Sequence, residues 1–196
     1  DDLIVEFRDA DGPRILSLQV KSSIRVSGAA TNKDFRDVLN RARETRKNSG
    51  FQVDRDAYGY VVENVAEAGH RSLNRLIDWA VSSPTPADFD RRFAEGGAAA
   101  AAERALRDEL TPVIGACSIE GEWNFYRHFV AARLSGLDET GIVWTEITNR
   151  LQELVTSNED GQEVLLFDRL CRIVRDGAGT ARKWTRTTLL VQLRGV

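Results

Sequence analysis

The chain has 196 residues, of which 42% are hydrophobic and 29% are charged, and its formal net charge at pH 7 is −3. These values are ordinary for a globular protein of one or two domains, and they exclude nucleic-acid binding through overall positive charge alone. Two cysteines without paired spacing and only two histidines argue against a zinc site or a disulfide framework.

Two apolar runs with a turn between them open the chain. Residues 1–5 carry two aspartates followed by Leu-Ile-Val, and residues 16–21 carry the second run, Leu-Ser-Leu-Gln-Val-Lys. Between them, residues 11–13 (Asp-Gly-Pro) combine a side-chain acceptor, a residue free to adopt positive φ, and a fixed φ. This order predicts a β-hairpin.

The hairpin gathers polar side chains of three kinds. Because successive side chains of a strand point to opposite faces, Gln19 and Lys21 share one face while Val20 lies on the other. The end of the second strand returns to the start of the first, so we expect Asp2 to lie beside Gln19 and Lys21. A carboxylate, an amide and an ammonium group would then meet at one place.

An aspartate, an apolar strand and then Gln-x-Lys resemble the PD-(D/E)XK nuclease superfamily, in the variant with glutamine in place of the second acid. This variant is similar to that of Mrr-type restriction endonucleases and of nuclease modules attached to NTPase sensor proteins of bacterial antiphage defence. The resemblance covers residues 1–23 as a motif and extends more weakly to about Ala94. It implies an α/β fold with a restriction-endonuclease-like sheet flanked by helices, partial at its N-terminal side.

The resemblance also implies a role for each residue of the motif. Asp2 would ligate a metal ion, with Asp1 as the reserve ligand, and Gln19 and the main-chain carbonyl of Val20 would complete the protein ligands. Mg²⁺, for which Mn²⁺ is a substitute, takes oxygen ligands and keeps several waters. Beside a phosphate it polarises the phosphoryl oxygen and lowers the pKa of a bound water, while Lys21 would orient that water or offset charge in the transition state.

The next segment alternates helix and strand. Thr31 or Asn32 is a suitable N-cap for a helix over residues 34–47, whose apolar residues follow helical spacing. The pattern then predicts a third strand over residues 58–65 and a second helix over residues 73–81. Strand, strand, helix, strand, helix is the order that a sheet flanked by helices needs.

Basic residues cluster in the first of these helices: Arg36, Arg41, Arg43, Arg46 and Lys47. Such a cluster favours a surface that follows the backbone of a nucleic acid. A solvated helix face explains the same pattern equally well, and both interpretations stay open.

Proline and glycine interrupt the chain after the second helix, and the remainder reads as helical. Residues 82–86 (Ser-Ser-Pro-Thr-Pro) form the break, and a short helix with two phenylalanines follows. The alanine-rich run over residues 98–107 predicts another helix, since alanine is the best helix former. Four more amphipathic helices are expected over residues 123–134, 144–155, 163–174 and 184–193.

The composition of these segments suggests two parts. We assign residues 1–95 to a nuclease-like core and residues 96–196 to an all-α helical bundle or linker. The chain has no methionine and opens directly on the strand of the metal site, so we expect a fragment of a longer protein. It has no phosphate-binding loop, no signal peptide and no apolar run of the roughly 20 residues that cross a bilayer, which predicts a cytoplasmic location and no membrane contact.

Three hypotheses follow. The first is a metal-dependent DNA endonuclease domain that cuts double-stranded DNA, within a larger antiphage defence protein that has a fused or associated NTPase or sensor module and forms homo-oligomers. The alternative is a non-catalytic interaction or oligomerisation module with a degenerate nuclease fold. The third is nucleic-acid binding without cleavage, for which affinity falls steeply with salt.

Overall fold

The computed structural model describes residues 2–9 and 12–133, together with residues 145, 149, 169, 170, 172, 185, 187, 188 and 191. Residues 2–133 form one compact unit, and Asp1 with residues 134–196 forms another. The helices predicted over residues 144–155, 163–174 and 184–193 lie outside the described residues, apart from these isolated positions. The fold described below is that of residues 2–133.

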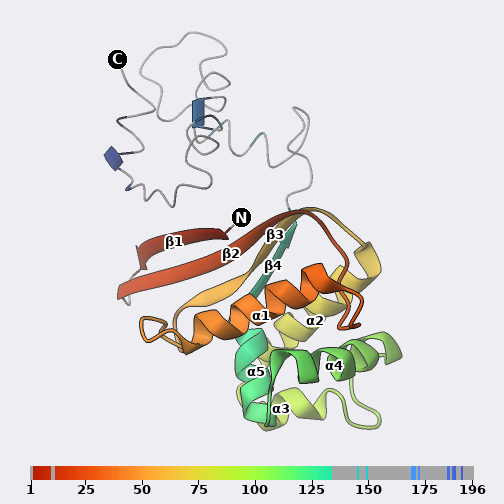
Figure 1. Cartoon of the computed structure of the whole chain (residues 1–196). Helices are drawn as coiled ribbons and strands as arrows, with labels where there is room; N and C mark the ends of the chain where they lie inside the picture. Colours follow the sequence, from red (N-terminus) through yellow and green to blue (C-terminus); the bar gives the residue numbers. More distant parts are fainter. Residues whose placement is uncertain are drawn as a thin grey trace. The chain divides into compact units, whose positions relative to one another are not determined.

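Within this unit, four strands form one mixed sheet in the order β1-β2-β3-β4 (Figure 1). Strand β1 (Asp2–Asp9) pairs antiparallel with β2 (Gly12–Ile24), which confirms the predicted hairpin. Strand β3 (Ala57–Val65) pairs parallel with β2, and β4 (Phe129–Arg133) pairs parallel with β3. Parallel neighbours need long crossover connections, and the helices of the unit lie in those connections.

Five helices pack on one side of this sheet (Figure 1). They are α1 (Lys33–Lys47), α2 (Glu67–Ser82), α3 (Pro86–Arg91), α4 (Ala101–Ile114) and α5 (Ile119–Arg127). The predicted α/β class, a sheet flanked by helices, is therefore confirmed. No helix in the described part of the chain is both long enough and apolar enough to cross a membrane.

The core lies between the sheet and these helices. On β3 the alternate side chains Tyr58, Tyr60 and Val62 are at most 1% exposed. They meet Phe35 and Leu39 of α1, which are spaced by four residues and are fully buried, as the apolar pattern predicts. Burying a side chain of this size contributes roughly 1.5–3 kcal/mol, so this face of the sheet anchors α1 firmly.

Helix α1 begins where the sequence predicts, but by a different contact. Asn32 is its N-cap residue, yet the side chain makes no capping hydrogen bond to the helix. Its Nδ2 instead donates to the carbonyls of Arg25 at 2.6 Å and Ser27 at 3.0 Å. Asn32 thereby ties the start of α1 to the chain that leaves β2, which sets the position of the helix over that strand.

Strand β4 replaces the end of a predicted helix. The prediction of one helix over residues 123–134 is wrong beyond Arg127, where α5 ends and β4 follows after His128. The carbonyl of His128 accepts a hydrogen bond from the amide of Tyr58 at 2.9 Å, which starts the pairing with β3. Pairing with a distant strand outweighs the local helical spacing, and spacing alone carries no information about it.

A glycine in β3 makes this pairing possible. Gly59 has φ of 158°, and a Cβ built on it would lie 1.8 Å from the carbonyl oxygen of Val130 in β4. No residue with a side chain fits there unless the strands separate. Gly59 is therefore the position in β3 that admits β4 as its neighbour.

The predicted division between residues 95 and 96 falls inside this unit, between α3 and α4. Helix α5 is tied to α2 by the indole of Trp123, whose Nε1 donates to the carbonyl of Ala80 at 2.9 Å. Strand β4, which follows α5, completes the sheet. Residues 96–133 therefore belong to the same packed unit as the sheet.

Candidate active site

The predicted site residues lie on the hairpin, at the start of β1 and in the second half of β2. The antiparallel register places Asp2 directly opposite Gln19. Residues directly opposite in such a pair belong to one face of the sheet, with Cβ atoms ~4.5–5.5 Å apart. The other proposed carboxylate, Asp1, lies outside the described residues.

The three consecutive residues of β2 have different environments. Gln19 is only 7% exposed and lies on the face covered by the helices, whereas Val20 is 44% exposed. Lys21 returns to the helix side, with 26% of its side chain exposed. The alternation that the sequence predicts for these positions is confirmed, and it leaves an ammonium group at the edge of the buried amide.

The amide oxygen of Gln19 is buried without a partner among the described residues. Its Oε1 accepts no hydrogen bond from them, although it is closed off from solvent. Leaving a buried acceptor unsatisfied costs about 1–3 kcal/mol, because the oxygen loses its water and gains nothing in return. A bound group that supplies a hydrogen-bond donor or a positive charge would remove this penalty.

The oxygen ligands that these residue types offer are of the kind that a hard cation such as Mg²⁺ takes. An amide oxygen with free lone pairs, placed opposite an aspartate in the register, is the type of ligand that Mg²⁺ takes. Among the described residues there is no group of three or more His, Cys, Asp or Glu side chains that could hold a metal. A site here would therefore depend on amide and main-chain oxygens as well as on carboxylate.

Helix α1 runs along β2 and adds polar groups to the same place. Asp37 lies level with Lys21, and its Oδ2 is 4.0 Å from the lysine Nζ. Four helix residues advance ~6 Å and two strand residues advance ~6.6 Å, so positions four apart on α1 lie level with positions two apart on β2, in the opposite chain direction. Arg41 then falls level with Gln19, and both residues line one cavity.

This cavity has a volume of about 270 Å³ and lies between α1 and the hairpin. Its polar wall comes from both elements: Ser17, Gln19, Arg41, Glu44, Thr45 and Asn48. Glu44 accepts a hydrogen bond from Lys47 at 2.9 Å, and this bond holds the pKa of the carboxyl below its usual range. The Glu44 and Lys47 charges therefore offset each other at the rim.

The basic residues of α1 prove to be unlike one another. Four of the five have contacts within the fold: Arg36 donates to the Gly28 carbonyl at 2.9 Å, Arg43 donates to the Val113 carbonyl at 3.2 Å, Arg46 lies 5.9 Å from the Phe125 ring centroid, and Lys47 pairs with Glu44. Arg41 is exposed and has no hydrogen bond or ion pair among the described residues. The cluster is thus not one uniform basic surface.

Sequence reasoning missed the part that α1 plays at this site. Asp37 and Arg41 are four residues apart and therefore share a helix face, which was a readable signal. What the sequence did not contain was the register between that face and β2. The contact of Asp37 with Lys21 depends on that register.

A second polar group lies in the core beside the site. The Tyr60 hydroxyl is hydrogen-bonded to His70 Nδ1 at 2.9 Å, and His70 Nε2 is 3.1 Å from Asn74 Nδ2. Burial lowers the pKa of His70 and raises that of Tyr60 far above its usual value. Both ring nitrogens have partners, so we assign this group to the packing of α2 on β3.

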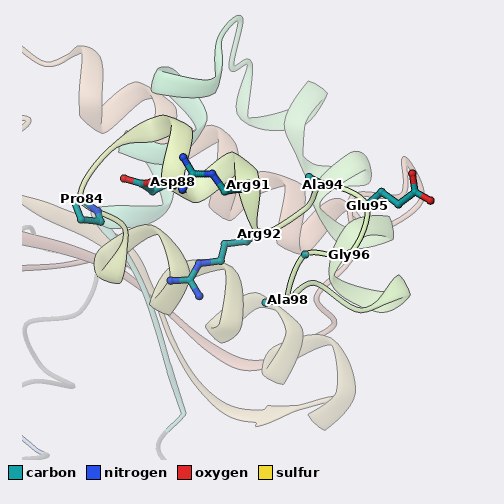
Figure 2. Close-up of a pocket in the computed structure, with 9 residues that line it drawn as sticks. Pro84, Asp88, Arg91, Arg92, Ala94, Glu95, Gly96 and Ala98 are labelled. Atoms are coloured by element: carbon teal, nitrogen blue, oxygen red, sulfur yellow. Dashed lines mark hydrogen bonds and ion pairs between the residues drawn. The ribbon is translucent and has the colours of Figure 1, made fainter.

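A larger cavity of about 540 Å³ lies beside α3 and the loop that follows it (Figure 2). Arg91 lies against Asp88, at 3.0 Å, while Arg92 and Glu95 point away from that pair. Asp88 also accepts a hydrogen bond from the Thr85 hydroxyl at 2.7 Å. None of the residues that line this cavity has a buried polar side-chain atom without a partner, so we place no chemistry there.

Four buried side-chain polar atoms in the described part of the chain have no hydrogen-bond partner: Gln19 Oε1, Ser83 Oγ, Arg104 Nε and the Tyr126 hydroxyl. Of these, Gln19 lines the cavity between α1 and the hairpin. Comparison of the chain with protein-family models, with curated proteins and with solved structures finds no match.

Proposed function

We propose that this chain carries a metal-dependent endonuclease site of the PD-(D/E)XK type, with glutamine in place of the second acid, that hydrolyses phosphodiester bonds in double-stranded DNA. The observation that carries the proposal is the unpartnered, buried Oε1 of Gln19, directly across the ladder from Asp2. Lys21 lies two residues further along the same face.

Each residue has one task in this proposal. Asp2, Gln19 Oε1 and the main-chain carbonyl of Val20 would hold Mg²⁺ or Mn²⁺, with Asp1 as the reserve ligand. The bound ion supplies Lewis acidity at a phosphoryl oxygen and makes water a stronger nucleophile. Lys21 holds positive charge next to the reacting phosphate and orients the attacking water.

The surroundings support these tasks. The described ladder between β1 and β2 begins at the pair of Asp2 and Gln19, so Val20 follows at the open end of that ladder. Asp37 lies 4.0 Å from Lys21 and forms an ion pair with it. Low exposure around Gln19 strengthens electrostatic interactions, since fewer waters screen them.

The wider context is part of the same proposal. The sequence of hairpin, helix and parallel strand is compatible with a restriction-endonuclease-like sheet. By resemblance, the chain would belong to a larger cytoplasmic antiphage defence protein with an NTPase or sensor module. Homo-oligomers would let two sites cut the two strands of DNA.

The direct test is plasmid cleavage by the purified protein with Mg²⁺ or Mn²⁺. Lys21→Ala should lower the cleavage rate by about 10²–10³-fold, because charge stabilisation in the transition state is lost. Lys33→Ala removes an exposed lysine at the start of α1 and serves as the matched control, with an unchanged rate expected. EDTA should abolish cleavage by all active variants.

Metal binding gives a second readout that needs no turnover. Mn²⁺ binding, followed by electron paramagnetic resonance, should weaken in Asp2→Asn and in Gln19→Leu but not in Lys33→Ala. Equal cleavage by the wild type and Lys21→Ala, or Mn²⁺ binding that does not depend on Asp2 and Gln19, would contradict the proposal.

One observation favours the alternative, a non-catalytic interaction module. On the sheet face opposite the helices, the apolar side chains of Leu3, Val5 and Val20 are 45%, 38% and 44% exposed. Exposed apolar groups on adjacent strands are typical of contact surfaces. Absence of both cleavage and Mn²⁺ binding, together with self-association that Val5→Asp disrupts, would support this function instead.

A further inference from the structure

We propose that Arg41 binds a backbone phosphate of the DNA strand, in the cavity between α1 and the hairpin, next to the phosphate that is cut. This inference rests on the proposed function, because that function supplies the DNA substrate. It adds a substrate-binding residue that the nuclease motif does not contain.

The state of the Arg41 side chain is the first reason. Its guanidinium is exposed and makes no hydrogen bond or ion pair with the residues that the structure describes, whereas Arg36 and Arg43 on the same helix donate to main-chain carbonyls. The fold therefore gains little from a positive charge at position 41. A charge that the fold does not use is free for a ligand.

The cavity is the second and independent reason. Arg41 shares it with Gln19, which is 7% exposed and whose Oε1 has no partner. An exposed arginine alone would be ordinary, but Arg41 lines the same cavity as a buried polar atom that lacks a partner among the described residues. The two side chains face one space and would contact neighbouring parts of one bound molecule.

Position along the groove identifies the ligand group. Asp37 lies beside Lys21, and Arg41 follows four residues later, ~6 Å along the helix axis. A DNA strand that follows this groove, with its reacting phosphate at the Lys21 end, would therefore place an adjacent phosphate near Arg41. A guanidinium binds phosphate through two parallel N–H···O hydrogen bonds, which makes arginine well suited to this contact.

The rest of the cavity is compatible with a phosphate and its sugar. The hydroxyl groups of Ser17 and Thr45 line it and are potential donors. The carboxylate of Glu44 would repel an anion, but Lys47 pairs with it at 2.9 Å. The volume of about 270 Å³ lies just below the ~300–1,000 Å³ of small-molecule pockets, which favours a segment of backbone over a whole free cofactor.

The test measures DNA binding apart from cleavage. Fluorescence anisotropy of a labelled duplex in EDTA would give Kd for the wild type, Arg41→Ala, Arg41→Lys and Arg71→Ala over a series of salt concentrations. Arg71 is the matched control, an exposed arginine on α2 that lies 3.7 Å from Glu67. Arg41→Ala should raise Kd about tenfold and reduce the slope of log Kd against log salt by about 0.9, whereas Arg71→Ala should change neither.

Two further results complete the pattern. Arg41→Lys should recover part of the affinity, because lysine keeps the charge but loses the bidentate geometry. In cleavage assays Arg41→Ala should raise KM and leave kcat nearly unchanged, since the contact is made equally before and during the reaction.

The outcomes separate the two proposals. If Arg41→Ala binds DNA more weakly than the wild type, but the wild type shows no cleavage with any metal ion, Arg41 stands as a phosphate contact and the nuclease function is overturned. If cleavage depends on Lys21 but Arg41→Ala has the Kd and KM of the wild type, the role of Arg41 is overturned and the nuclease function stands. Equal losses in Arg41→Ala and Arg71→Ala would also overturn it, because they indicate only a general effect of charge.

Discussion

Two buried polar regions of this unit have opposite hydrogen-bonding states. Around Arg107, the guanidinium donates to Glu122 at 2.8 and 2.6 Å and to Asp90 at 2.9 Å, and Thr111 donates to Glu122 at 3.1 Å. Around Gln19, the buried Oε1 has no partner in the part of the chain that the structure describes. The hydrogen bonds around Arg107 indicate a structural role, although the nearby Tyr126 hydroxyl is buried without a partner among the described residues. The Gln19 oxygen differs in lining a cavity that it shares with an exposed arginine, and this makes it a candidate place for a ligand.

The difference has an energetic meaning. A buried ion pair with complete hydrogen bonding adds little net stability. Removing one partner leaves the other charge buried and unpaired, which costs about 3–5 kcal/mol. An unsatisfied amide oxygen already costs the folded state about 1–3 kcal/mol. Substitutions in the two regions should therefore change stability in opposite directions.

The largest effect is expected in the satisfied region. Arg107→Ala should lower the free energy of unfolding by about 3–5 kcal/mol, because Glu122, whose side chain is 4% exposed, would lose its partner. The variant also removes the guanidinium from above the Phe93 ring, 4.2 Å from its centroid. Urea denaturation measures the change.

The matched control is Arg91→Ala. Arg91 also pairs with an aspartate, Asp88, but its side chain is 74% exposed, so we expect a loss below about 0.5 kcal/mol. Similar losses in the two variants would mean that the Arg107 cluster is not the structural centre inferred here.

The sharpest comparison comes from the unsatisfied region. Gln19→Leu removes the stranded oxygen and fills the same space with apolar atoms, so the free energy of unfolding should rise by about 1 kcal/mol. Metal-dependent cleavage should be lost in the same variant, because the amide ligand is gone. Denaturation and plasmid cleavage on one protein preparation measure both changes.

Gln52→Leu supplies the control for this substitution. Gln52 is exposed in the loop before β3, and an exposed change of this kind stays within about 0.5 kcal/mol. If Gln19→Leu were destabilised by more than 1 kcal/mol instead, the oxygen of Gln19 would have a partner in solution, and the contrast between the two regions would fail.

The smallest effect concerns pH. Burial lowers the pKa of His70, with Glu67 raising it and Arg133 lowering it by smaller amounts, and burial also lowers the pKa of His128. The unfolded imidazole has its usual pKa of 6.5, so below this value the unfolded state binds more protons than the folded state. The stability contributed by the neutral rings is complete above pH 6.5 and declines as the pH falls below it.

Thermal unfolding between about pH 7.5 and about pH 5.5 checks this dependence. The midpoint should fall on acidification, and His70→Gln should show a shallower fall than the wild type. His128→Gln tests the second histidine, whose Nδ1 donates to the Asp56 carbonyl at 3.0 Å. A midpoint that rises on acidification over this interval would show that the rings are charged in the folded state.

Local patterns predicted much of the fold. The turn at residues 11–13 and the apolar runs around it were enough for the hairpin and for the pairing of Asp2 with Gln19. Helical spacing and strand composition located α1 and β3 to within about one residue. These features depend on residues close together in the chain, so a single sequence contains the information for them.

The sequence by itself determined the hairpin, the alternation of Gln19 and Lys21 with Val20, and the apolar face of α1, because backbone period and turn geometry are local properties. Only the tertiary structure decided that residues 129–133 form a strand, since the space beside Gly59 and the pairing with β3 are contacts between distant segments. It also decided that Asp37 meets Lys21, that Arg41 shares a cavity with Gln19, and that the Gln19 oxygen is left without a partner. Those three facts depend on how α1 lies across β2. The packing of the apolar side chains of α1 on the sheet sets that position, and the spacing of residues along the chain does not encode it.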